Sequence, residues 1–297
     1  MIDTAELMKQ VGRLRVLTNR LVDQHLTGAY HSVFKGQGIE FDEVREYAFG
    51  DDVRSIDWNV TARMGHPYIK RFAEERELTI IFLVDISGSQ CFGSTTRSKA
   101  ETAAEITCLL ALSAIKNQDN IGLILFSDRI EKSIPPRKGR TAAMRLVREV
   151  LAAEETPHGT DIAGALRFLT SVQKRKAVVF LISDFQDSGY EKALRVAARR
   201  HDVICCPISD PHELAIPDVG LIEIEDAETG DLFLADTRSS AFREHFAREA
   251  TLHTETLNRL LTRHNIDRLN LSTSTDRPVI DEVRRLFHRR QVRSKNG

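Results

Sequence analysis

The sequence predicts an α/β fold: a doubly wound, mostly parallel sheet with one antiparallel edge strand, preceded by an N-terminal helical and β extension. Two observations lead to this prediction. Apolar runs of about seven residues, such as LTIIFLV at 78–84, are rich in Ile and typical of strands buried on both faces. These runs alternate with helical stretches, an order that produces parallel strands joined by crossover helices.

Length and composition fit an ordinary globular protein. The chain has 297 residues, of which 41% are hydrophobic and 29% charged, with a net charge of -1. This length accommodates one large domain with an extension better than two equal domains, and the charge gives no bias toward nucleic acid or a membrane surface. The four cysteines lack the spacing of a zinc site, so we expect reduced thiols: Cys91, Cys108, Cys205 and Cys206.

The beginning of the chain does not read as a targeting segment. Asp3 and Glu6 interrupt any apolar stretch there, and no run in the chain approaches the roughly 18 apolar residues of a membrane span. We therefore expect a cytoplasmic protein without a membrane span. Apolar residues three and four positions apart predict a helix over residues 4–26, which either packs on the protein body, the interpretation we favour, or docks a partner.

Residues 28–77 are dense in charge and carry the only tryptophan, so we assign residues 1–77 to a helix and extension and 78–297 to the sheet domain. A strand or helical turn is expected near 41–47, a short helix at 56–63 and a strand at 68–72. Gly36 and Gly38 favour a turn over a nucleotide site, because the other residues of a phosphate loop are missing. Trp58 either forms a contact surface or folds the extension onto the sheet.

The sheet domain divides into alternating strands and helices. The expected strands are 78–84, 121–126, 130–134, 177–182, 203–208 and 269–272, with a hairpin formed by 221–224 and 232–234. The expected helices are 98–116, 141–153, 162–172, 190–200, 239–264 and 278–290. We expect the edge strand at 130–134 to be antiparallel and to stop at Pro135 and Pro136.

Five oxygen-bearing residues are predicted to converge at one edge of the sheet: Asp85, Ser87, Ser89, Thr160 and Asp184. Open α/β sheets place their ligand sites there, beyond the carboxyl ends of the strands. Hydroxyls and carboxylates without histidine or thiolate suit a hard cation, Mg²⁺ or Mn²⁺. The alternative is that the serines only cap the following helix.

Three stretches place the chain in a family by resemblance. The order GQGIEFDEVREY, GDDVRSIDWNVTAR and YIKRFAEERE, followed by VDISGS, resembles the bacterial family called domain of unknown function 58 over residues 34–89. The remainder looks like the von Willebrand factor A-type fold that the family is thought to contain. The D-x-S-x-S pattern, a separate Thr and a separate Asp resemble the metal-ion-dependent adhesion site of such domains, with Asp85, Ser87, Ser89, Thr160 and Asp184 in those positions. Phe185 departs from the glycine that many relatives have after the last aspartate.

The resemblance implies a protein-interaction module rather than an enzyme. In such domains the serines and the threonine contact the ion, the aspartates often act through water, and the open position takes a partner's acidic group. Proteins of this family are often encoded beside MoxR-type AAA+ ATPases, so such an ATPase or its client is the expected partner.

Two other functions stay open. One is a metal-dependent hydrolase that uses ion-activated water, which the absence of a convincing general base disfavours. His158 is the nearest candidate base for a nucleophilic serine, although a lone loop histidine is more often structural. The other is a structural domain with a vestigial site. The basic closing stretch RRLFHRRQVRSKNG favours a solvated tail over nucleic-acid binding, because no aromatic platform accompanies it.

Overall fold

The computed structural model describes residues 40–73, 77–91, 97–153, 159–225, 232–274, 276 and 278–295, together with scattered positions between 11 and 34. The chain forms two compact units. One consists of Phe34–Leu78, and the other combines Thr79–Gly297 with Met1–Val33.

The smaller unit is a two-stranded hairpin with short helices. β1 (Glu40–Glu46) pairs antiparallel with β2 (Tyr68–Ala73), so the stretch near 41–47 is a strand. Between them lie the 3₁₀ helix η1 (Val53–Ser55) and α3 (Trp58–Met64). Asp57 caps α3 by accepting hydrogen bonds from the backbone N–H groups of Asn59 and Val60. The predicted turn at Gly36 and Gly38 lies outside the described residues.

The larger unit contains the predicted doubly wound sheet, and the predicted fold class is confirmed. Its strands lie in the order β5, β4, β3, β6, β7, β10, with β11 also on β7. All pairs are parallel except β4 with β5 at the edge. The strands are β3 (Thr79–Asp85), β4 (Asn120–Phe126), β5 (Ile130–Arg137), β6 (Val178–Ser183), β7 (Asp202–Ser209), β10 (Asp267–Arg268) and β11 (Leu271–Ser272). The order reverses between β3 and β6, the kind of position where open α/β sheets bind ligands.

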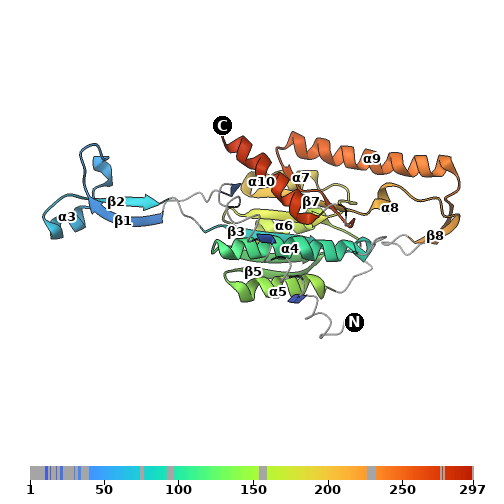
Figure 1. Ribbon diagram of the computed structural model, residues 1–297, viewed down its shortest axis with the longest axis horizontal. Coiled ribbons are helices and arrows are strands. Elements are labelled where there is room, and N and C mark those ends of the chain that lie inside the picture. The colour runs from blue at the N-terminus through green and yellow to red at the C-terminus, as the bar shows by residue number, and fades with distance from the viewer. Residues whose placement is uncertain are drawn as a thin grey trace. The chain divides into compact units, whose positions relative to one another are not determined.

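Helices cover both faces of this sheet (Figure 1). They are α4 (Lys99–Lys116), α5 (Arg140–Leu151), α6 (Ile162–Val172), α7 (Glu191–Arg200), α8 (Pro211–Leu214), α9 (Ser240–Arg263) and α10 (Val279–Lys295). α4 packs against α5 and α10, whereas α6, α7 and α9 contribute to one core with alternate residues of the central strands. Side chains of β3 point alternately to the two faces, and those from Ile80 to Val84 are all buried, as the apolar run predicts.

The edge strand β5 differs from the sequence prediction. It continues through Pro135 and Pro136 to Arg137, so the prediction that the prolines stop it is wrong. An edge strand tolerates proline because only one side of it is hydrogen-bonded. Gly122 of β4 makes room for it: a Cβ there would lie 3.1 Å from the Cγ of Pro136 and from the carbonyl oxygen of Ile134.

The structure also tests the predictions for the last strand, the hairpin and the N-terminal helix. The last strand, predicted at 269–272, is two short pieces, β10 and β11, on either side of Leu269. The hairpin is present as β8 (Leu221–Glu225) and β9 (Leu232–Asp236), while its turn lies outside the described residues. Near the N-terminus, Val11 and Val22 are buried in helical positions, which agrees with the packing interpretation.

Candidate functional site

A turn at the end of β3 gathers the first three predicted residues. Asp85 is the last residue of the strand, and the 3₁₀ helix η2 (Gly88–Cys91) begins three residues later. The Ser87 N–H donates to Asp85 Oδ1 at 3.0 Å, and the hydroxyls of Ser87 and Ser89 lie 3.2 Å apart. The carboxylate and the two hydroxyls therefore face a common region.

The neighbouring strand β6 brings its own acid to the same edge. Ser183, the last residue of β6, donates its hydroxyl to Asp85 Oδ2 at 2.6 Å and accepts the Phe185 N–H at 3.0 Å. Burial raises the pKa of Asp85 to about 6, and the charge of Asp184 adds to this rise, while hydrogen bonds from Ser183 and Ser87 oppose it. Asp85 and Asp184 are thus two buried carboxylates near each other, an arrangement in which two negative charges are unfavourable.

Thr160 comes to the edge from the loop that precedes α6. The N–H of the next residue, Asp161, donates to the carbonyl of Ser127, which follows β4, at 2.8 Å. The chain after β3 is tied to the same place, because the Ile86 N–H donates to Phe126 at 2.8 Å. The Thr160 Oγ1 is buried and has no hydrogen-bond partner among the described residues. An unpaired buried hydroxyl carries a free-energy penalty that a ligand would remove.

Lys99 also lies at this edge, although it was not among the predicted site residues. Its side chain is 1% exposed, and its Nζ lies 2.9 Å from Asp184 Oδ2 and 2.5 Å from Glu213 Oε1. Burial alone lowers the pKa of this lysine, but the two carboxylates outweigh it and raise the pKa above its ordinary value. Lys99 therefore stays charged and joins α4 to the end of β6 and to α8.

The donor set fits a hard cation. Three hydroxyls and two carboxylates supply only oxygen, and the Thr160 hydroxyl is without a partner in the part of the chain that the structure describes. Within that same part, no three His, Cys, Asp or Glu residues gather into a metal site. The site differs from such clusters because three of its five donor groups are hydroxyls, and its occupancy by a metal stays a prediction.

Phe185, where many relatives have glycine, keeps a backbone conformation that favours glycine. Phe185 has φ 60°, in the left-handed region that glycine adopts most readily. Its side chain is fully buried, and its ring lies 6.0 Å from that of Tyr190. The loop therefore keeps the conformation expected of a glycine, while the phenylalanine side chain fills the core under α7.

Sequence reasoning missed Lys99, Ser183 and Glu213. One signal for Lys99 was present: it directly follows the N-cap Ser98, where a positive charge opposes the helix dipole and so requires nearby acids.

The candidate base His158 lies outside the described residues. At the C-terminus, the stretch expected to become a tail after residue 290 stays helical to Lys295, and Arg290 pairs with Asp202 and Asp267.

Comparison with known proteins identifies the family. Residues 43–256 match the family described as protein of unknown function DUF58. The chain is also 30% identical to the uncharacterized proteins Rv1480 of Mycobacterium tuberculosis and Mb1516 of Mycobacterium bovis, over 98% of this chain and 92% of theirs. The chain belongs to the DUF58 family.

Solved structures with a similar chain path include the following three proteins. BatB from Bacteroides thetaiotaomicron is 17% identical with a TM-score of 0.45, covering 72% of this chain and 98% of that one. An aerotolerance-related membrane protein from Bacteroides fragilis is 15% identical with a TM-score of 0.44, covering 73% and 99%. The SpRpn10 VWA domain is 12% identical with a TM-score of 0.39, covering 70% and 94%. In the described part of this chain, no helix has the length and apolar character needed to cross a membrane.

Proposed function

We propose that this chain is a protein-interaction module that binds an acidic group of a partner through Mg²⁺ held at the carboxyl edge of the sheet. Ser87, Ser89 and Thr160 would hold the ion through their hydroxyls. Asp85 and Asp184 would orient the site and balance its charge. Mn²⁺ would suit the same oxygen donors.

Two observations carry the proposal: the buried Thr160 hydroxyl has no hydrogen-bond partner among the described residues, and the charges of the buried carboxylates Asp85 and Asp184 repel each other. A hydroxyl with a purely structural role would be expected to find a partner within the protein. A divalent cation would accept its lone pair and relieve the repulsion between Asp85 and Asp184.

The bound ion would supply an electrophilic centre with at least one open position for an external carboxylate. The residues of the chain would do the rest. Asp85 is fixed by the N–H of Ser87 and the hydroxyl of Ser183, so its orientation does not depend on the ligand. Lys99 already neutralises part of Asp184, which leaves more of the ion's charge for the partner.

The resemblance to a family encoded beside MoxR-type AAA+ ATPases makes such an ATPase, or a client presented to it, the first partner to test. The test is a pull-down with the full chain in Mg²⁺ and in EDTA. We expect capture in Mg²⁺ and release by EDTA.

The matched variant is Thr160→Val, which replaces an unpaired hydroxyl with a methyl group of similar size. Because this hydroxyl has no partner within the described residues, the variant should fold as well as the parent chain yet lose metal-dependent capture. Thr262→Val, at an exposed position of α9, is the control and should keep it. Equal capture with and without EDTA would place the contact elsewhere. Mg²⁺-dependent hydrolysis lost in Ser87→Ala and Asp184→Ala would replace the binding function with the hydrolase.

A further inference from the structure

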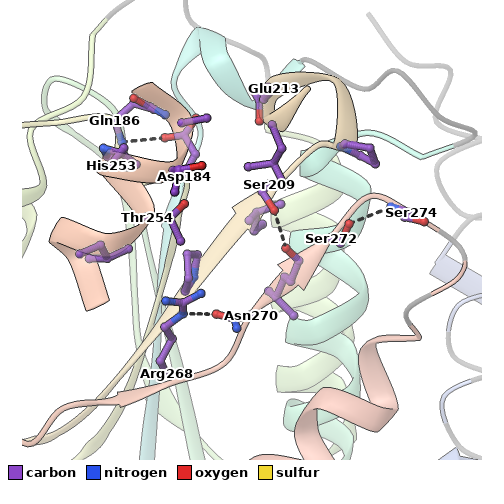
Figure 2. Close-up of a pocket in the computed structure, with 18 of the residues that line it drawn as sticks. Asp184, Gln186, Ser209, Glu213, His253, Thr254, Arg268, Asn270, Ser272 and Ser274 are labelled. Carbon is purple, nitrogen blue, oxygen red and sulfur yellow. Dashed lines mark hydrogen bonds between the residues drawn. The ribbon is translucent and has the colours of Figure 1, made fainter. Parts of the chain in front are cut away.

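A pocket of about 770 Å³ opens beside the site, at the carboxyl ends of β6, β7 and β11 and under α8 and α9. Asp184 is among its lining residues, so the pocket begins where the predicted metal site ends. Figure 2 shows His253 and Gln186 beside Asp184, and Arg268 with Asn270 at the far end of the view. This volume is within the range of sites that hold ligands of several residues or of drug size.

The acidic side chains that line the pocket are mostly neutralised by the protein itself. Lys99 pairs with both Asp184 and Glu213. On the helices, Glu255 pairs with Arg259 at 2.8 Å and Glu282 pairs with Arg285 at 2.5 Å. Asp276 is the remaining acid, and it is exposed. Four of the five lining acids have a basic partner, but Lys99 serves two of them, so the pocket keeps a small net negative charge that Arg268 partly offsets.

Two nitrogen-bearing groups in the pocket lack an ion-pair partner among the described residues. Arg268 is half-buried, and its Nε donates only to the side-chain oxygen of Asn270. Burial, and then the charge of Arg289, lowers the pKa of this guanidinium, and the charge of Glu282 partly opposes the decrease. The Nε2 of His253 is buried without a hydrogen-bond partner among the described residues. A partly desolvated arginine and an unpaired imidazole nitrogen in one cavity favour a ligand with anionic acceptors.

We propose that this pocket holds an acidic peptide segment of the partner, with one carboxylate at the ion and a second carboxylate on Arg268. The inference rests on the proposed function for the first carboxylate only. The planar guanidinium matches a carboxylate in a two-point contact, and the apolar lining residues Pro207, Leu214 and Leu257 would cover the peptide between its two acids.

The experiment uses the full chain and capped glutamate–glycine peptides, with binding measured by fluorescence anisotropy in Mg²⁺. One peptide carries a single glutamate, and a series carries two glutamates at increasing separation. We expect the best two-glutamate peptide to bind about ten- to hundred-fold more tightly than the single-glutamate peptide. A single-glutamate peptide with a free C-terminus distinguishes a terminal carboxylate from a side-chain carboxylate as the second anion.

Arg268→Gln should remove the gain from the second glutamate and leave the binding of the single-glutamate peptide unchanged. Arg263→Gln is the matched control, because this exposed arginine of α9 does not line the pocket. His253→Leu should reduce the gain as well, and it breaks no hydrogen bond of the ring Nε2 in the described structure. Thermal melting of each variant shows whether it is folded.

The outcomes separate the two proposals. A gain that does not depend on Arg268, or inorganic phosphate binding at Arg268 with no gain from a second glutamate, would overturn the peptide assignment. An Arg268-dependent gain that persists in EDTA would support the pocket and overturn the role of the ion. Loss of Mg²⁺-dependent binding in Thr160→Val together with no second-glutamate gain would support the proposed function and refute the pocket.

Discussion

Phe185 combines a left-handed backbone with a fully buried aromatic side chain. The two properties have opposite effects on stability, because the conformation costs about 1–2 kcal/mol for a residue with a Cβ, whereas burial of the ring stabilises the fold by more. The position therefore offers a direct test of how the loop after β6 is held.

We predict that Phe185→Gly destabilises the protein less than Phe185→Ala does. Loss of the ring should cost about 3–5 kcal/mol in Phe185→Ala, and Gly should recover part of this because it adopts φ 60° without strain. At Phe82, which is equally buried but lies in strand β3, the order should reverse and Gly should be worse than Ala. Urea unfolding of the four variants measures this, and the same order at both positions would contradict the left-handed backbone at Phe185.

His201 is a buried histidine whose two ring nitrogens have no hydrogen-bond partner in the described structure. Burial, and then the charge of Arg200, lowers its pKa below the ordinary value. The folded protein therefore binds fewer protons at this ring than the unfolded chain does. Stability from this residue is present above the unfolded pKa of about 6.5 and is lost as pH falls below it.

The corresponding prediction is that His201→Leu weakens the pH dependence of unfolding below about pH 6.5. One histidine contributes a slope of at most about 1.4 kcal/mol per pH unit in the window between its folded and unfolded pKa values. Unfolding free energies measured by urea across that window give the slope. His288→Leu, at an exposed position, should keep the parent slope, and an unchanged slope in His201→Leu would assign the acid sensitivity to other groups.

At the scale of elements, Lys99 connects three of them: α4, the end of β6 and α8. α8 follows β7 directly, and its N-cap Asp210 also accepts a hydrogen bond from Thr273 after β11 at 2.6 Å. The lysine therefore joins the predicted metal site to the wall of the pocket. Breaking a buried pair by removing one partner leaves the other charge uncompensated.

We expect Lys99→Met to lower the free energy of unfolding by about 3–5 kcal/mol without metal, because Asp184 and Glu213 lose their counter-charge. It should also enlarge the stabilisation by Mg²⁺, since Asp184 becomes free to interact with the ion. Thermal melts with and without Mg²⁺ measure both effects. Lys132→Met should stay within about 1 kcal/mol of the parent, because Glu149 keeps Arg145 and Arg148 as partners. An equal Mg²⁺ increment in Lys99→Met and the parent would show that Lys99 does not tune the site.

The elements that sequence predicts well are those whose pattern is local. The apolar run ending at Asp85 predicts β3, its direction and the position of the site, because a strand buried on both faces has few alternatives. The continuation of β5 through Pro135 was not predicted, although the strand was expected at an edge, because it also depends on Gly122 of β4, whose missing side chain leaves room for Pro136. Lys99 was missed for a similar reason, because its acids lie 85 and more positions away in the chain.

At the scale of the whole molecule, the DUF58 match extends over both compact units, from residue 43 in the hairpin unit to residue 256 in α9. The residues of the predicted metal site and those that line the pocket all lie in the larger unit. The smaller unit exposes Trp58, which is 68% accessible, together with Phe49.

The free energy of unfolding of the whole chain is the most direct measure of the role of Asp85. Asp85 carries a raised pKa, so the folded protein without metal disfavours its charge. Asp85→Asn keeps the shape of the side chain and removes that charge. We therefore predict that, without metal at neutral pH, Asp85→Asn unfolds at the same free energy as the parent or higher, whereas most changes at a buried polar residue destabilise.

In Mg²⁺, the parent should be more stable than Asp85→Asn. An ion that binds only the folded state stabilises it by about 2.7 kcal/mol at a concentration one hundred times the Kd, and this increment needs the Asp85 carboxylate. Thermal melts of the parent, Asp85→Asn and the half-exposed control Asp281→Asn, each with Mg²⁺ and with EDTA, measure the difference. The control should keep the full Mg²⁺ increment. If Asp85→Asn keeps it too, Asp85 does not serve the ion; if it loses the increment while staying as stable as the parent in EDTA, the carboxylate is held there for a cation rather than for the fold.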